Sequence, residues 1–358
     1  MAQSTRHLHS RTSEHPHGHA VTPGAFDRRE LFRVGGIGLC GALLAACTST
    51  SSSSTSTAAA TTAQVPVSTV GGGTVSVPAT VVSDVLAGFD AFAATVHVAR
   101  EGNLWVVESN GMPTHSMMTG ITSWQQQYPV PQPYTGANAF RFPATPRLAA
   151  TPVSARHALF NGAIALAVDG VPIFNALNNR GDDAYLAGEL DNWGGHSGRA
   201  DDYHYHAAPL YLQELVGPGK PIAYALDGFA IYGDTEPDGS PMLALDDLNG
   251  HTGGDGVYHY HGTRTYPYIN GGMRGEVTVT NDHIDPQPVT HPFRPDGTPL
   301  RGAVISGFDT GGTNNYELTY TLAGGTYKVA WVIAGNAVTF TYTAADGATR
   351  TEQFTRRD

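Results

Sequence analysis

The amino-acid sequence predicts a mainly β protein in which a duplicated β-rich unit with pseudo-twofold symmetry precedes a small C-terminal antiparallel β-meander. Several short segments alternate apolar and polar residues, and this period of two is that of a β-strand. Glycine (43 residues) and proline (23 residues) are frequent, as they are in chains with many turns. One pattern of tyrosine and histidine residues also occurs twice with the same internal spacing, which indicates a repeated structural unit.

The composition excludes several classes of protein. Apolar residues make up 41% of the chain, which is too many for a wholly disordered protein. The formal net charge of -11 argues against nucleic-acid binding, which needs a basic surface, so we expect no nucleic-acid partner. Two cysteines are too few for a disulfide-rich fold or a cysteine-based zinc site. The unusual feature is the 16 histidines, whose placement is informative.

Residues 1–46 have the features of an export signal. Arg28 and Arg29 precede an apolar, glycine-rich run at 34–46, which is too short to span a bilayer as a helix. The arginine pair is similar to a twin-arginine export signal. The run ends in Leu-Ala-Ala-Cys, which is similar to the lipobox of bacterial lipoproteins, so we expect Cys47 to be the acylated N-terminus of the mature chain. The alternative is an uncleaved anchor or a chance arginine pair.

The rest of the chain divides into three parts. Residues 47–80 are rich in serine and threonine and predict a flexible linker, because such a segment cannot bury a core. Residues 81–283 contain the internal repeat, and residues 284–358 contain the meander. We therefore expect a cell-envelope protein tethered by a lipid at Cys47 to the outer face of the cytoplasmic membrane, or to the outer membrane where the cell has one.

The internal repeat covers about residues 163–207 and 221–262. Each copy contains Gly-His-[Ser/Thr]-Gly followed by Tyr-His-Tyr-His, and each copy has a related Asp-Gly segment upstream, at 168–174 and 226–232. Two such matches are very improbable by chance and indicate a duplication, so we expect two related units that pack face to face. The histidines that recur 55 positions apart are His196 and His251, His204 and His259, and His206 and His261.

The spacing of these histidines is suited to metal binding. Tyr-His-Tyr-His is typical of a strand, on which residues i and i+2 share a face, so two imidazoles can converge on one ion while the tyrosines point to the opposite face. A third histidine from the glycine-flanked segment completes a three-nitrogen site, which suits copper or zinc among other transition metals. We therefore predict metal ligation by His196, His204, His206, His251, His259 and His261.

Several alternatives remain open at this point. The histidines could instead form a metal-free polar core, and both triplets could share one centre on the pseudo-dyad. His115 follows a turn and is a further ligand, a substrate-facing group or a surface residue. Asp202 and Asp255 are either hydrogen-bond partners of ligand histidines or solvated carboxylates. The acidic segment 234–239 fails the spacing of an EF-hand and favours a solvated loop.

Three functional classes agree with this pattern. The first is a metal-binding or metal-handling module at the cell envelope. The second is a metal-dependent hydrolase or oxidoreductase in which a tyrosine of either Tyr-His-Tyr-His segment acts as an acid or hydrogen-bond donor. The third is a metal-free structural module. The sequence contains none of the common nucleotide, hydrolase or metalloprotease motifs, so no catalytic residue is assigned and no protein partner is identified.

These motifs resemble those of the bacterial YHYH domain family. The resemblance covers roughly residues 92–283 and rests on the paired Tyr-His-Tyr-His segments, their Gly-His lead-ins, and the segments at 110–115 and 169–174. The family is largely uncharacterised, so the resemblance implies little biochemistry. Its members often carry a cysteine beside the Gly-His motif, where this chain has Trp193. A disulfide that the resemblance would imply for this loop is therefore not expected in this chain.

The C-terminal segment predicts a four-stranded antiparallel meander without identifiable chemistry. Its alternating segments are separated by turn signals such as Gly-Asn and Asp-Gly. We expect the meander to cover an edge of the main domain or to bind a partner. Trp105 and Trp331 lie in strand patterns and are expected in the core. The four expected strands are 316–322, 327–333, 338–342 and 351–355.

Overall fold

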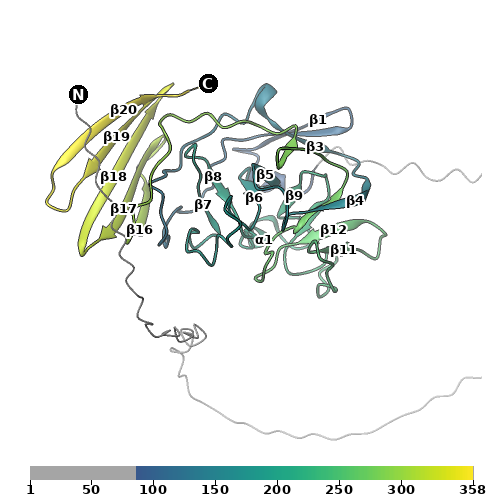
Figure 1. Ribbon diagram of the computed structural model, residues 1–358. Helices are drawn as coiled ribbons and strands as arrows, with labels where there is room; N and C mark the ends of the chain where they lie inside the picture. The colour runs from purple at the N-terminus through teal and green to yellow at the C-terminus, as the bar shows by residue number, and fades with distance from the viewer. Residues whose placement is uncertain (1–85, 358) are drawn as a thin grey trace, which may run out of the picture. The chain divides into compact units, whose positions relative to one another are not determined.

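The structure is a computed structural model that describes residues 86–357 (Figure 1). The predicted export signal (1–46), the predicted lipid attachment at Cys47 and the predicted linker (47–80) lie outside the described residues. Within the described part, no helix combines the length and the apolar character needed to cross a membrane. The fold is mainly β, as the sequence predicts, and the described residues belong to one compact unit.

A three-stranded antiparallel sheet begins the described chain. Its order is β1-β2-β3, and the central strand buries Trp105, as expected. Two further antiparallel pairs, β4 with β13 and β14 with β15, connect distant segments of the chain. The bounds of these elements are η2 (Phe89–Phe92), β1 (His97–Glu101), β2 (Leu104–Glu108), η3 (Gly136–Asn138), β3 (Phe140–Pro143), β4 (Leu148–Ser154), β13 (Gly272–Gly275), β14 (Thr278–Thr280) and β15 (His283–Asp285).

The duplicated unit forms an eight-stranded sheet. The strand order is β11-β12-β10-β9-β5-β6-β8-β7, which reads as two related four-strand halves that meet at β9 and β5. The only α-helix in the described part, α1 (Leu212–Val216), connects the halves. The strands are β5 (Ala163–Ala167), β6 (Pro172–Phe174), β7 (Gly195–Ser197), β8 (Tyr203–Tyr205), β9 (Ala223–Ala225), β10 (Ala230–Tyr232), β11 (Gly250–Thr252) and β12 (Tyr258–His261).

The strand register confirms the pseudo-twofold repeat. Leu166 of β5 pairs with Tyr224 of β9, which is its own counterpart 58 positions later, so the pseudo-twofold axis passes through this pair. The parallel pairings of β6 with β8 and of β10 with β12 also correspond residue for residue. The expectation of face-to-face packing is wrong, because the two units join edge to edge. Every residue of β5 and β9 is buried, so these strands are stable only in the middle of a sheet.

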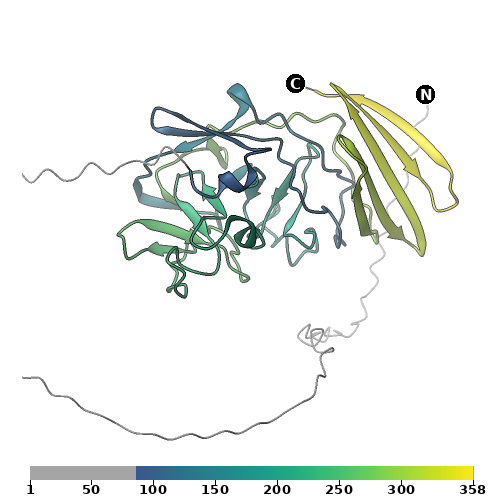
Figure 2. The same cartoon turned by 180° about the vertical axis from the view of Figure 1, so that it is seen from behind.

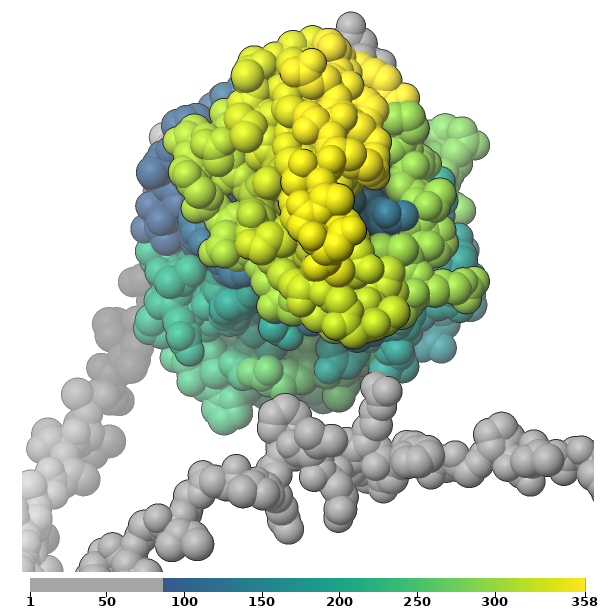
Figure 3. Space-filling model, turned by 90° about the vertical axis from the view of Figure 1, so that its left-hand side faces the viewer, coloured from purple at the N-terminus to yellow at the C-terminus, as the bar shows by residue number. Residues whose placement is uncertain are grey.

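The C-terminal meander has five strands rather than the expected four. The additional first strand, β16, contains Gly307 and a register shift after Ile305, which interrupt the alternating pattern. Figures 1 and 2 show the meander as a layer beside the rest of the described chain, and Figure 3 shows its outer face. The strands are β16 (Val304–Thr310), β17 (Asn315–Leu322), β18 (Gly325–Ala334), β19 (Ala337–Thr343) and β20 (Thr349–Thr355).

The meander packs against the main body through an aromatic contact. Trp331 of β18 is fully buried, as expected, and its Nε1 donates a hydrogen bond of 3.2 Å to the Pro129 carbonyl oxygen. Its ring centroid lies 5.6 Å from that of Tyr128. The meander therefore shares its core with the segment that follows β2.

Candidate metal sites

The tyrosines of the Tyr-His-Tyr-His strands lie on one face, where their hydroxyls donate hydrogen bonds to aspartate carboxylates. The Tyr203 hydroxyl donates to Asp191 Oδ2 at 2.7 Å, and the Tyr205 hydroxyl donates to Asp169 Oδ2 at 2.9 Å. The second copy repeats both Tyr–Asp pairs at the corresponding positions. The tyrosines thereby fix the strand so that the histidines between and beside them point to the opposite face. The corresponding pairs are Tyr258 with Asp246 at 2.9 Å and Tyr260 with Asp227 at 2.6 Å.

The first His cluster, which we call site 1, comprises His196, His204 and His206. His196 of β7 is the cross-strand partner of His204 on β8, and His206 follows β8 directly. The Nε2 atom of His206 lies 3.1 Å from the Nε2 atom of His196 and 3.1 Å from that of His204. Three ring nitrogens therefore converge on one point, as the sequence spacing predicts.

The partners of the other ring nitrogens define the tautomers in site 1. His204 Nδ1 lies 3.0 Å from the Asp202 carbonyl oxygen, and His206 Nδ1 contacts the Asn175 carbonyl oxygen. A carbonyl oxygen only accepts, so both Nδ1 atoms carry the proton and both Nε2 atoms present lone pairs. In the neutral form of both rings, two lone pairs thus face each other at 3.1 Å, and neither ring donates a hydrogen bond to the other.

A proton on His206 Nε2 does not resolve the contact at neutral pH. Burial and the neighbouring His204 lower the pKa of His206 to about 3, although the Asn175 carbonyl opposes this shift. Burial, with the other two rings, also holds the pKa of His196 well below its usual value. A tetrahedral zinc ion with Zn–N bonds of about 2.0–2.1 Å places its ligand nitrogens about 3.3 Å apart. The observed separations fit such an ion.

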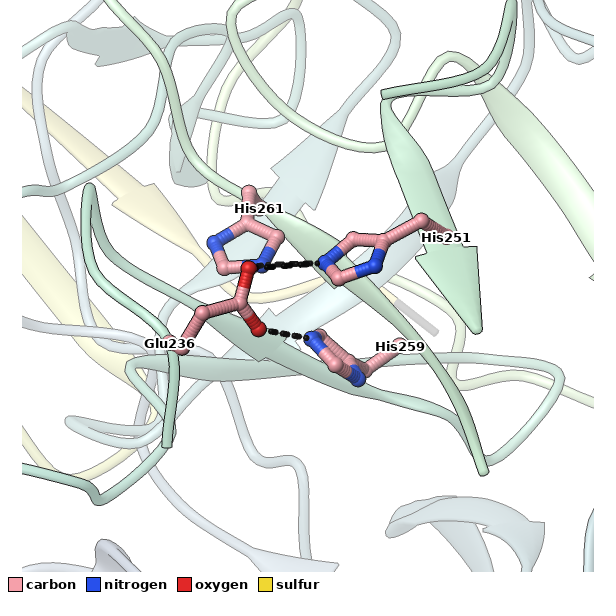
Figure 4. A group of neighbouring side chains, drawn as sticks. All are labelled: Glu236, His251, His259 and His261. Carbon is pink, nitrogen blue, oxygen red and sulfur yellow. Dashed lines mark hydrogen bonds and ion pairs between the residues drawn. The ribbon is translucent and has the colours of Figure 1, made fainter. Parts of the chain in front are cut away.

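The second His cluster, which we call site 2, comprises Glu236, His251, His259 and His261 (Figure 4). Glu236 Oε1 lies 3.0 Å from His251 Nε2, and Oε2 lies 3.1 Å from His259 Nε2. The Nε2 atoms of His251 and His261 are 3.2 Å apart, and His261 Nδ1 faces the Gly233 carbonyl oxygen at 2.8 Å. Site 2 thus adds a carboxylate to the three nitrogens found in site 1.

Glu236 is ionised in this setting. Burial alone raises the pKa of its carboxyl, but the Leu243 backbone N–H donates a hydrogen bond to it, and the rings of His251 and His261 lie close by. Together with a hydrogen bond to His259, these interactions lower the pKa below its usual value. An ionised carboxylate beside three imidazoles is a suitable donor set for a divalent transition metal.

The sequence prediction missed Glu236, because the acidic segment 234–239 favoured a solvated loop. In the structure Glu236 of this segment lies against His251 of β11 and His259 of β12, and this residue is only 7% exposed. A signal for its position exists in the repeat. Asn178 and Glu236 are 58 positions apart and begin equivalent turns, in which Gly181 and Gly239 donate to their carbonyl oxygens. Asn178 therefore occupies in the first copy the position that Glu236 holds in the second.

The structure separates the two clusters. Site 1 lies on β7 and β8, and site 2 lies on β11 and β12, which are the opposite edges of the eight-stranded sheet. The pseudo-twofold axis passes between β5 and β9 in the middle of the sheet, and β6 and β10 separate these two strands from the strands that carry the clusters. The structure therefore favours two sites over one shared centre.

The remaining candidate residues have different positions. His115 joins neither cluster, because it lies on the tyrosine face, where its Nε2 is 2.9 Å from the Tyr205 hydroxyl and its Nδ1 faces the Ser116 carbonyl oxygen. Asp202 lies beside His204, with its Oδ2 3.4 Å from His204 Nδ1. Asp255 is exposed and caps the Val257 N–H. Of the two aspartates, only Asp202 is placed to orient a ligand histidine.

Comparison with known proteins agrees with the motif analysis. Residues 139–241 match the model of a family described as YHYH protein. This segment contains site 1 and Glu236, but it ends before the second Tyr-His-Tyr-His strand. The chain matches no curated protein and no solved structure. Residues 139–241 thus carry the sequence pattern of the YHYH protein family, which the motifs of the sequence predict.

Proposed function

We propose that this protein is an extracytoplasmic lipoprotein, tethered to the membrane through Cys47, that binds one copper or zinc ion at each of sites 1 and 2. The observation that carries the metal assignment is the contact between His204 Nε2 and His206 Nε2, two lone pairs 3.1 Å apart in a buried setting. Buried polar atoms normally have complementary partners. A metal ion gives both nitrogens one partner, whereas a metal-free polar core leaves them facing each other.

The surroundings of the ligands support the same assignment. Ligand histidines in proteins usually donate their second ring N–H to a carbonyl oxygen or a carboxylate, which fixes the tautomer. His204 and His206 in site 1, and His261 in site 2, all have this arrangement. Imidazole nitrogens suit both copper and zinc, and the additional carboxylate in site 2 does not exclude either ion.

The metal content of the purified full chain tests this proposal. We expect about two metal ions per wild-type chain and about one in each of the variants His204→Ala/His206→Ala and His259→Ala/His261→Ala. The control His97→Ala removes an exposed histidine outside both sites and is expected to keep both ions. Unchanged metal in the first double variant contradicts the ligand assignment, and absence of metal under every loading condition contradicts the proposal.

The tether is proposed from the sequence at the N-terminus. Arg28 and Arg29 precede a short apolar run that ends at Cys47, and a serine- and threonine-rich segment follows. Twin-arginine export carries folded proteins, which agrees with metal loading before translocation. We expect Cys47→Ala to move the protein from the membrane fraction to the soluble fraction, as measured by fractionation of the producing cells. Retention of this variant in the membrane would contradict lipid attachment at Cys47.

A further inference from the structure

We infer that site 1 keeps one coordination position open toward a cavity and binds a small anionic ligand there, whereas Glu236 fills the equivalent position in site 2. This inference rests on the proposed metal binding and adds a division of roles between the two sites. It follows from three features of the molecule: a cavity beside site 1, the hydrogen bonds of Asn178, and the charges around the first cluster.

The cavity beside site 1 has a volume of about 550 Å³, and all three site 1 histidines contribute to its wall. This volume is within the range of small-molecule binding sites. Phe174 stacks on the His204 ring with 3.9 Å between the ring centroids, so one side of the cluster is apolar. Among the described residues, the side chains of site 2 do not line this cavity. Much of the remaining wall consists of amide side chains, namely Gln125, Gln127, Asn161, Asn175, Asn178, Asn179 and Gln287.

Asn178 does not complete site 1 as Glu236 completes site 2. Its Oδ1 accepts hydrogen bonds from the backbone N–H groups of Arg180, at 2.9 Å, and Asp182, at 3.1 Å, so both oxygen lone pairs are used. Its Nδ2 donates to Glu189 Oε2 at 3.2 Å and has no lone pair for a metal. An ion held by the three histidines therefore has a free position on the cavity side.

The charge of the donor set favours an anion at this position. Three neutral imidazoles leave the full charge of a divalent ion uncompensated, whereas the Glu236 carboxylate offsets part of it in site 2. The arginines that line the cavity, Arg180 and Arg199, are opposed by Glu189, Asp202 and Asp296. Glu189 is paired with Arg180, and Asp202 faces His204, so a bound ion makes the cluster end of the cavity net positive.

Anion binding to the cobalt-loaded full chain tests this inference. Co(II) gives visible absorption bands that respond to a change of ligand, and azide serves as the small anion. We expect the wild type with two Co(II) ions to bind one azide per chain, because only site 1 has an open position. The variant Asn178→Glu/Glu189→Gln supplies a fourth ligand to site 1 without changing the charge of the cavity. It is expected to keep two Co(II) ions and to bind azide at least tenfold more weakly.

Two further variants make the test specific. Glu189→Gln alone is the matched control and is expected to bind azide at least as tightly as the wild type, because it leaves the Arg180 charge without its carboxylate partner. Glu236→Asn gives site 2 the residue that site 1 carries, and it is expected to bind a second azide. A chain with two Co(II) ions and no azide response overturns the inference, as does an azide response that persists in the double variant or the absence of a second azide in Glu236→Asn. A chain that binds none of Co(II), zinc and copper overturns the proposed function instead.

Discussion

Removal of bound zinc by a chelator is expected to lower the Tm of the protein by about 10 °C for each site emptied. A ligand that binds only the folded state stabilises it by about 4 kcal/mol when its free concentration is about 1,000 times its Kd. In a domain of this size, about 1 kcal/mol shifts the Tm by roughly 2–4 °C. Thermal unfolding followed by circular dichroism, with and without chelator, measures the effect.

We expect a large decrease in Tm because each bound ion links segments that are separate in the sequence. Site 1 connects β7 to the end of β8, and site 2 connects the loop that holds Glu236 to β11 and β12. The chelator effect should disappear in a His206→Ala/His261→Ala variant and persist in His97→Ala. Because each comparison is made within one variant, the intrinsic cost of the substitution cancels. A wild type that holds metal but has the same Tm with and without chelator would contradict this prediction.

The repeat was predictable because it consists of identical residues at a constant spacing, whereas the pairing of its strands was not. β6 and β8 pair in parallel across the long segment 175–202, and alternation along a strand carries no information about such a distant partner. The edge-to-edge joining of the halves did have a local signal. β5 reads Ala-Ile-Ala-Leu-Ala, a continuous apolar run that is typical of a central strand rather than of one with a solvated face.

The six histidines could be grouped from sequence because their spacing on a strand fixes which face each one shares. Glu236 could not be found in this way, because an acidic segment rich in turns is more often solvated, and only the path of the loop brings this carboxylate to β12. The same limit applied to His115. Its position after a turn was clear from the sequence. Only the structure shows that it faces the tyrosines, because its Nε2 contacts the Tyr205 hydroxyl.

The substitution Asp227→Ala is expected to destabilise the apo protein by about 4 kcal/mol and to weaken zinc binding at site 2 by at least tenfold. Asp227 is fully buried, and its Oδ2 accepts hydrogen bonds from the Tyr260 hydroxyl at 2.6 Å and the Gly275 N–H at 2.8 Å. Its Oδ1 accepts from the Phe229 N–H at 3.2 Å. Each buried donor left without a partner costs about 1–3 kcal/mol. Urea unfolding in the presence of chelator measures the free energy of unfolding of the metal-free protein.

Zinc binding at site 2 weakens because Tyr260 lies between His259 and His261 on β12. The hydrogen bond from its hydroxyl to Asp227 fixes the position of this strand. Loss of a group that orients metal ligands typically costs about 10–100-fold in metal affinity. Asp227→Asn keeps the size of the side chain and one acceptor oxygen, so it should cost less stability than Asp227→Ala. Asp169→Ala removes the equivalent partner of Tyr205 and should weaken site 1 instead. Because the two carboxylates serve different ends of one sheet, equal losses at both sites in either alanine variant would show that the Tyr–Asp pairs stabilise the fold without positioning the histidines.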